Sequence, residues 1–274
     1  MQYQSDKYPS LTKSYKNFYP FKIGTTSFIY PDLYLPNVKM LAPFVDEIEL
    51  LLFESAPVAS LLSKPVIREL KRISQDLQVS YNIHLPTDIS VCDAIPIRQD
   101  QAVDTLLSII ERVAPLSPSS YTLHVPYPSD AKNGANDLRE WQHVVYRNLE
   151  KIVLAGVPAG KIALETLDYP LEFMETIIAD LNLSICLDIG HLILGGTDIQ
   201  SVFHKHAAAV SIVHLHGVEG RRDHGPLNRL PHNLLDSVVR GLKRFTGTVS
   251  LEIFNFKHLD TSLNLLEQRW NLVS

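Results

Sequence analysis

Histidine and carboxylate side chains recur at the ends of short apolar segments along this chain. His84, His124, Glu165 and Asp188 each end such a segment, and Glu252 lies within another, SLEIF. Imidazole and carboxylate groups are metal ligands and proton carriers. A carboxylate buried alone among apolar residues costs several kcal/mol, and a bound cation removes that cost. The residue types and their placement therefore predict a shared metal site.

Two further segments carry more of these groups. His214 and His216 are two residues apart, as are Cys186 and Asp188, and residues two apart share one face of a strand. The segment CLDIGH also places His191 three residues after Asp188, within reach of the same cation. More than four imidazole and carboxylate groups indicate two or three divalent ions of zinc, manganese or iron. Cys186 is interpreted as a small core residue.

The segment after these histidines, HGVEGRRDHGPLNRLPH, is too polar to belong to a core. Its glycines and charges are typical of a loop, and we expect a mobile loop that contacts substrate. Asp223 and His224 are expected to complete a metal site there. Guanidinium groups bind phosphate in bidentate fashion, so Arg221, Arg222 and Arg229 are candidate substrate contacts. The alternative is an exposed loop of solvated charges.

Eight apolar segments rich in Ile, Val and Leu alternate with segments of helical spacing, which is typical of βα units around a parallel sheet. The predicted strands are 22–26, 47–53, 79–84, 121–125, 161–165, 184–188, 210–216 and 248–254. The predicted helices are 36–45, 66–77, 99–114, 137–155, 170–179, 199–206, 234–245 and 262–272. Eight such units predict an α/β fold, a single eight-stranded (β/α) TIM barrel over residues 20–274, whose active site lies at the carboxyl ends of the strands. Residues 1–19 are interpreted as an N-terminal extension, either a surface strap or a disordered tail.

The overall composition restricts the partners. A net charge of -5 has the wrong sign for binding nucleic acid, so we expect none. No apolar run approaches the roughly 18 residues of a membrane span, so we expect no membrane partner. The two cysteines, Cys92 and Cys186, fit a reducing compartment, and we expect a cytoplasmic protein. The oligomeric state stays open.

The segment ends HLP, HVP, LET, LDIGH, VHLHG and SLEIF resemble, in order, those of the xylose isomerase-like barrel superfamily, which includes endonuclease IV and sugar epimerases. For the epimerases, the resemblance implies one metal held by Glu165, Asp188, His214 and Glu252. For endonuclease IV, it implies three ions around a phosphate, with added ligands that match His84, His124 and His191. The D-x-H pair of those nucleases is replaced here by adjacent Asp223 and His224. The added histidines favour phosphoester hydrolysis over isomerisation.

The early segment IGTTSFIYPDLYLPNVKMLAPFVDEIELLLFES is similar to the start of the cobamide-remodelling phosphodiesterases, the CbiR family. This resemblance implies a corrinoid substrate, an adenosylated cobamide whose nucleotide-loop phosphodiester is hydrolysed. The products would be a cobinamide phosphate and an α-ribazole-type nucleoside. Aromatic residues such as Tyr30 suit a broad apolar ligand, and Tyr30 is a substrate-binding candidate.

The leading hypothesis is therefore a metal-dependent phosphodiesterase in which Glu165 bridges two ions and a metal-bound water attacks phosphorus. Glu252 and His216 are the other catalytic candidates. An alternative is a sugar isomerase or epimerase, in which Glu165 and Glu252 move a proton beside one metal. A corrinoid- or sugar-binding barrel without catalysis is another, and a DNA-repair nuclease is disfavoured by the net charge.

Overall fold

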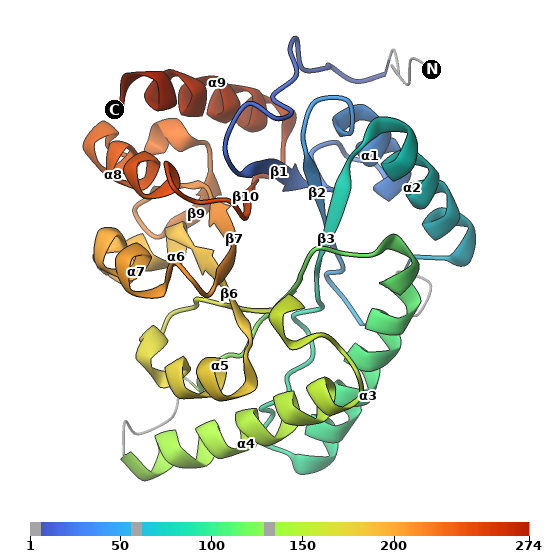
Figure 1. The fold of residues 1–274 in the computed structure, drawn as a ribbon, viewed down its shortest axis with the longest axis vertical. Coiled ribbons are helices and arrows are strands. Elements are labelled where there is room, and N and C mark those ends of the chain that lie inside the picture. Colours follow the sequence, from blue (N-terminus) through green and yellow to red (C-terminus); the bar gives the residue numbers. More distant parts are fainter. Residues whose placement is uncertain (1–6, 56–61, 129–134, 274) are drawn as a thin grey trace.

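The computed structural model describes residues 7–55, 62–128 and 135–273. In this part of the chain, eight parallel strands close into one barrel in the order β1, β10, β7, β6, β5, β4, β3, β2, and helices surround it (Figure 1). The barrel strands are β1 (Lys22–Thr26), β2 (Glu47–Leu51), β3 (Ser80–His84), β4 (Tyr121–Leu123), β5 (Ile162–Glu165), β6 (Ser184–Asp188), β7 (Val210–Leu215) and β10 (Thr248–Leu251). The predicted TIM barrel is confirmed.

The α-helices lie around the barrel and bury one apolar face each. They are α1 (Tyr34–Leu41), α2 (Lys64–Leu77), α3 (Pro96–Val113), α4 (Ala135–Leu154), α5 (Glu175–Leu181), α6 (Ile189–Leu194), α7 (Ile199–His206), α8 (His232–Leu242) and α9 (Phe256–Leu272). In α8, for example, Leu235, Val238, Val239 and Leu242 are buried, the spacing of one helical face. Among the described residues, the structure contains no helix with the length and apolar character needed to cross a membrane.

Three segments differ from the predicted elements. Helix α6 follows β6 directly and was not predicted, because six residues are too few to show helical periodicity. The single helix predicted over 170–179 is a short 3₁₀ helix, Leu171–Phe173, followed by α5. The segment predicted as a loop after β7 contains an antiparallel pair, β8 (Gly217–Glu219) and β9 (Arg222–Gly225), which is too short and polar for a strand pattern.

The segment that precedes β1 lies against the barrel from Lys7 onward. Leu11, Tyr15 and Tyr19 are buried in the main core. The backbone nitrogen of Tyr15 donates to the carbonyl of Phe44 at 2.8 Å. Residues 7–19 therefore form a strap on the surface, and residues 1–6 of the predicted extension lie outside the described residues.

The parallel register brings the polar strand ends together. Asp188 on β6 pairs with His214 on β7, and His214 pairs with Ser250 on β10. Because the strands are parallel, their carboxyl ends lie at one rim of the barrel (Figure 1). The side chains that end these strands therefore meet at a common centre.

Candidate metal centre

Four acidic and imidazole groups from four strands meet at this rim. They are Glu165 at the end of β5, Asp188 at the end of β6, His214 on β7 and Glu252 just after β10, and we call them the central group. All four are buried, and their ligand atoms lie within 4.8 Å of one another. Three carboxylates this close repel one another strongly when buried.

The contacts of Nδ1 of His214 indicate which kind of ligand the central group could bind. Nδ1 of His214 lies 3.3 Å from Oε1 of Glu165 and 3.2 Å from Oε2 of Glu252. It lies 3.8 Å from Oδ2 of Asp188. One nitrogen carries at most one hydrogen and cannot serve three carboxylates. A divalent cation bound among these oxygens and this nitrogen would neutralise the carboxylates and accept the nitrogen lone pair, so the group fits a metal.

Two histidines extend the centre on one side of Glu165. Oε2 of Glu165 lies 3.2 Å from Nε2 of His84 and 2.7 Å from Nε2 of His124. Nδ1 of His84 lies 3.0 Å from the carbonyl oxygen of Leu85, which places its hydrogen on Nδ1 and leaves Nε2 free to bind a metal. Glu165 thus presents one oxygen to this pair and the other to His214. The pair and Glu165 form a second group of side chains that could hold a metal ion.

A third group lies on the side of Glu252 and comprises His216, His224 and Glu252. Nδ1 of His216 accepts from the backbone nitrogen of His224 at 3.0 Å, so Nε2 carries the hydrogen and faces Oδ2 of Asp188 at 3.2 Å. The ring of His216 also packs on Gly190. A Cβ atom at position 190 would lie 1.9 Å from its Cε1 atom, so only glycine fits there.

Two predicted ligands lie farther out. Nε2 of His191 is 3.9 Å from Oδ2 of Asp223, and neither residue belongs to the compact groups found among the described residues. Nδ1 of His191 donates to the carbonyl oxygen of Thr166 at 2.9 Å, which leaves Nε2 free. The adjacent His224 adopts a left-handed backbone conformation with φ 51°. Asp223 therefore lies between two imidazoles, since its Oδ1 is also 3.8 Å from Nε2 of His224, and of these two adjacent residues His224 alone belongs to a compact group among the described residues.

The predicted substrate contacts are placed differently from one another. Arg221 and Arg222 are exposed on the β8–β9 hairpin, and Arg229 pairs with Glu219 at 2.7 Å. Tyr30 is buried, and its hydroxyl donates to the carbonyl oxygen of Pro9. The structure therefore gives Tyr30 a packing role under the N-terminal strap, which corrects its prediction as a substrate contact.

Two features of the site were missed in the sequence. Glu49 on β2 is buried, and its Oε1 lies 2.9 Å from Nε2 of His214. The signal was present as the alternation of two acidic residues, Glu47 and Glu49, within an otherwise apolar strand. Exposed aromatic rings also border the centre: Phe53 is 48% exposed, and Phe254, which is 37% exposed, has its ring 5.2 Å from that of His224.

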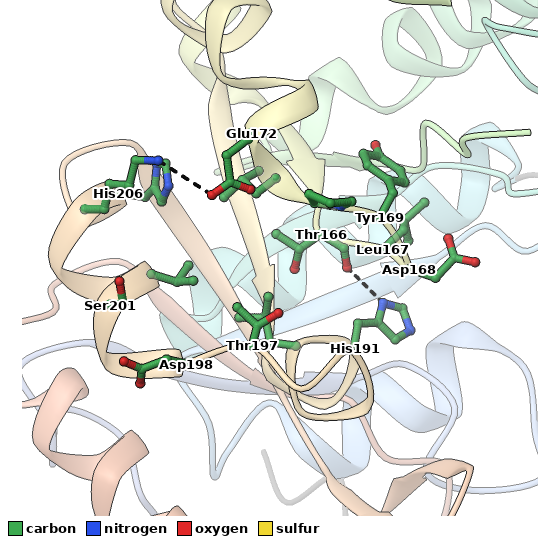
Figure 2. A pocket seen from close by; sticks show the side chains of 16 residues that line it. Thr166, Leu167, Asp168, Tyr169, Glu172, His191, Thr197, Asp198, Ser201 and His206 are labelled. Atoms are coloured by element: carbon green, nitrogen blue, oxygen red, sulfur yellow. Dashed lines mark hydrogen bonds and ion pairs between the residues drawn. The ribbon is translucent and has the colours of Figure 1, made fainter. Parts of the chain in front are cut away.

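A pocket of about 290 Å³ lies beside the centre, between the loop after β5 and helices α6 and α7 (Figure 2). Thr166 and His191, which hydrogen-bond each other, form its border with the metal groups. On its far wall Lys205 lies 3.7 Å from Glu172. The pocket adjoins the centre through His191 and contains none of the central group.

The electrostatics of the site follow from burial and close opposite charges. Burial lowers the pKa of His84, but the contact with Glu165 outweighs it and raises that pKa to about 9. Burial also lowers the pKa of His214, but the acidic groups around it raise it well above its usual range. Burial raises the pKa of Glu165, but His124 and His214 hold it well below its usual range. Without a metal, the site therefore holds imidazolium and carboxylate pairs.

We expect the metal-free protein to lose stability as the pH rises from about 6.5 to 9. The pKa of His84 is raised to about 9 in the folded chain, whereas it is about 6.5 in the unfolded chain. Its stabilising contribution is therefore complete below pH ~6.5 and lost as the pH passes through ~9. This difference amounts to on the order of 3 kcal/mol. Urea unfolding of chelator-treated protein across this range measures it. The fall should be smaller in His84→Gln, and a flat profile for the wild type would contradict the assignment.

The sequence matches the xylose isomerase-like TIM barrel family over residues 45–269, and the chain belongs to this family. Members of the family that resemble it in structure are enzymes, among them epimerases and an endonuclease IV. No curated protein matches the sequence.

Solved structures share the whole fold at low sequence identity. A D-tagatose 3-epimerase-like protein is 20% identical with a TM-score of 0.76, over 92% of this chain and 98% of that chain. The D-psicose 3-epimerase of Clostridium cellulolyticum H10, solved with D-tagatose, is 15% identical with a TM-score of 0.67, over 92% and 99% of the two chains. The IolI protein, solved with a zinc atom, is 16% identical with a TM-score of 0.65, over 92% and 96%. At these identities the likeness shows the fold.

The expectation of a cobamide phosphodiesterase is wrong. The similar structures are mostly sugar epimerases, including an L-ribulose 3-epimerase and a 3-keto-D-glucoside 4-epimerase from E. coli, and they favour the isomerase alternative. None of these proteins is a cobamide phosphodiesterase, and the family match gives only the wider superfamily. The early segment, residues 23–55, builds β1, α1 and β2. The early segment therefore forms part of the barrel itself.

Proposed function

We propose that the protein is a metal-dependent isomerase or epimerase of a sugar or a similar hydroxylated carbonyl compound. The observation that carries the proposal is the central group, in which Glu165 and Glu252 present carboxylate oxygens within 4.8 Å of each other beside Asp188 and His214. The similar structures named as epimerases of D-tagatose, D-psicose and L-ribulose support the same reading. The exposed ring of Phe254 would pack on the apolar C–H face of such a sugar.

The two carboxylates have the placement that proton transfer requires. A bound divalent cation would polarise the carbonyl of the substrate and so acidify the neighbouring C–H bond. Glu165 ends β5 and Glu252 follows β10, with β6 and β7 between these strands, so the two side chains approach from separate positions around the rim. One carboxylate would take the proton from carbon. The other would return a proton to the opposite face of that carbon, or to the adjacent carbon in an isomerase.

The neighbouring histidines keep Glu165, the proposed base, in its ionised form. His124 and His214 hold the pKa of Glu165 well below its usual range, so Glu165 is ionised at neutral pH and able to accept a proton. Glu252 also has a lowered pKa, because the contact with His214 outweighs burial. Both carboxylates are therefore charged before substrate binds. One of them takes the proton from the substrate carbon, and the other must first take up a proton from solvent water before it can return one to the substrate.

We further propose that more than one divalent ion binds. The pair His84 and His124 shares Glu165 with the central group and supplies the ligands for a further ion. On the other side His224 lies near Glu252, whereas both ring nitrogens of His216 are engaged, by the backbone nitrogen of His224 and by Asp188. Imidazole and carboxylate ligands suit zinc, manganese or iron. The proposed partner is a small hydroxylated substrate, without nucleic acid or membrane, and the two free cysteines support a cytoplasmic location.

Exchange of substrate protons with solvent tests the proposed reaction. The metal-loaded protein is incubated in D₂O with D-tagatose, D-psicose and L-ribulose in turn, and products are followed by NMR and mass spectrometry. We expect deuterium at the carbon next to the carbonyl, together with an epimer or isomer. Glu252→Gln should abolish formation of the epimer or isomer, while Glu172→Gln, at the exposed wall of the side pocket, should retain it. Absence of exchange with every sugar and every metal would overturn the proposal.

A further inference from the structure

Glu49 and His214 form a fully buried pair inside the barrel. Both side chains have no exposed surface, and Nε2 of His214 lies 2.9 Å from Oε1 of Glu49. Strands β2 and β7 are not neighbours, since β1 and β10 lie between them, so the contact crosses the barrel interior. The two residues are 165 positions apart in the chain. Such a pair has no basis in local structure and is made only by the closed barrel.

Among the described side chains around Glu49, His214 is the one that can compensate its negative charge. The other carboxylate oxygen accepts from the hydroxyl of Ser250 at 2.7 Å. Among the described residues, no lysine or arginine forms an ion pair with Glu49, and His214 is its one imidazole partner. A buried carboxylate is costly unless an opposite charge or strong donors compensate it. The compensation here comes from the ring that also belongs to the central group.

The geometry determines which nitrogen of His214 carries hydrogen. A carboxylate oxygen at 2.9 Å from Nε2 requires a hydrogen between them, because two lone pairs would otherwise face each other. In the neutral ring, Nδ1 is then the acceptor, and Nδ1 is the atom that lies 3.3 Å from Glu165 and 3.2 Å from Glu252. A carboxylate behind a ligating histidine sets its tautomer and ring orientation and increases its basicity as a ligand.

Glu47, on the same strand, is a buried carboxylate that does not contact a candidate metal ligand, and it serves as a comparison for Glu49. It is equally buried, but it accepts from Ser119 and Thr248 at 2.8 Å each and pairs with Lys22 at 3.4 Å. None of these partners belongs to a metal-ligating group. Glu47 and Glu49 therefore share residue type, strand and burial and differ in what they touch.

We propose that Glu49 is a positioning residue of the metal centre, which accepts the Nε2 hydrogen of His214 and holds its Nδ1 lone pair toward the bound ion. The inference rests on the metal centre of the proposed function. It adds a residue on β2, outside the four strands that supply the central group. Glu49 itself does not contact the ion, since it lies on the opposite side of the imidazole ring.

The affinity of the protein for metal tests this role without reference to turnover. Chelator-stripped protein is titrated with zinc against a competing chromophoric chelator, and again with manganese. Glu49→Ala should weaken binding about 100-fold and Glu49→Gln about 10-fold, because glutamine keeps an acceptor for Nε2–H but loses the charge. Ser250→Ala, which frees one oxygen of Glu49, should weaken binding a few-fold. Glu47→Gln, the matched control, should bind as the wild type does.

A spectroscopic measurement separates positioning from general packing. The metal-loaded wild type should show a downfield, slowly exchanging Nε2–H proton in the NMR spectrum, which Glu49→Ala lacks and Glu47→Gln retains. Equal metal affinity in Glu49→Ala and wild type, or equal loss in the Glu47 and Glu49 variants, would overturn the inference. If Glu49→Ala does not fold, the metal affinities of Glu49→Gln and Ser250→Ala test the inference instead, and affinities equal to that of the wild type would overturn it. Glu49-dependent metal binding without sugar exchange would keep the inference and reject the proposed reaction.

Discussion

Replacing Glu165 with glutamine is expected to abolish turnover while the barrel stays folded. Glu165 presents Oε2 to His84 and His124 and Oε1 to His214, so it joins two groups of metal-ligating side chains. Glutamine has nearly the same shape, but its amide carries no charge and accepts no proton from carbon. Loss of a catalytic base alone costs about 10²- to 10⁴-fold in rate, and weaker metal binding adds to this. We therefore expect kcat to fall by about 10³-fold or more.

The measurement is deuterium exchange with the best sugar substrate at saturating metal. Thermal unfolding and circular dichroism establish that Glu165→Gln is folded. Glu172→Gln serves as the control, since Glu172 is exposed and pairs with Lys205 outside the metal groups. A folded Glu165→Gln protein with near-native kcat would remove Glu165 from the catalytic role.

Removal of metal is expected to have the second large effect, on stability as well as activity. Glu165, Asp188 and Glu252 are buried carboxylates that converge on Nδ1 of His214, and a bound cation would relieve their repulsion. An ion at about 1,000 times its dissociation constant stabilises the folded state by about 4 kcal/mol. For a chain of this size, that corresponds to a loss of roughly 8 to 16 °C in Tm when the ion is removed. Activity should disappear at the same time.

The experiment compares the protein before and after exhaustive chelation, with metal content measured directly. Adding back zinc, manganese or iron should restore Tm and activity together and identify the ions that support both. Glu47→Gln should show the full change, whereas His214→Ala, which lacks the nitrogen at the middle of the central group, should show little change in Tm. Unaltered Tm and activity in demonstrably metal-free protein would refute the metal centre.

The sequence predicted the barrel well because its signals are local. Strands β1 and β6 have the predicted bounds, since apolar runs of this length between helical segments specify strands buried on both faces. Helix α7 likewise begins and ends where its spacing predicts. Helix α6 was not predicted. Its six residues are stabilised at their start by the side chain of Asp188, which caps the helix by accepting from the backbone nitrogen of His191 at 2.7 Å.

The candidate metal ligands could also be predicted from the sequence, because a parallel barrel places the carboxyl ends of all its strands at one rim. His84, Glu165 and Asp188 were selected by residue type and position, and the structure brings them to one centre. Tyr30 was misplaced because an aromatic residue near a loop looks the same whether it faces substrate or, as here, the strap at Pro9. The substrate inferred from the early segment was wrong for a related reason, since similar packing segments occur in barrels that differ in chemistry.

By itself, the sequence determined the α/β barrel and the set of imidazole and carboxylate groups at its carboxyl rim. Only the tertiary structure decided which atom faces which. Glu165 divides its two oxygens between His124 and His214, and Glu49 reaches His214 across the interior. Strand periodicity specifies the face on which a side chain lies, but contacts between strands that are not neighbours depend on barrel closure. The tautomer of His214, and with it the direction of its free lone pair, follows from those contacts.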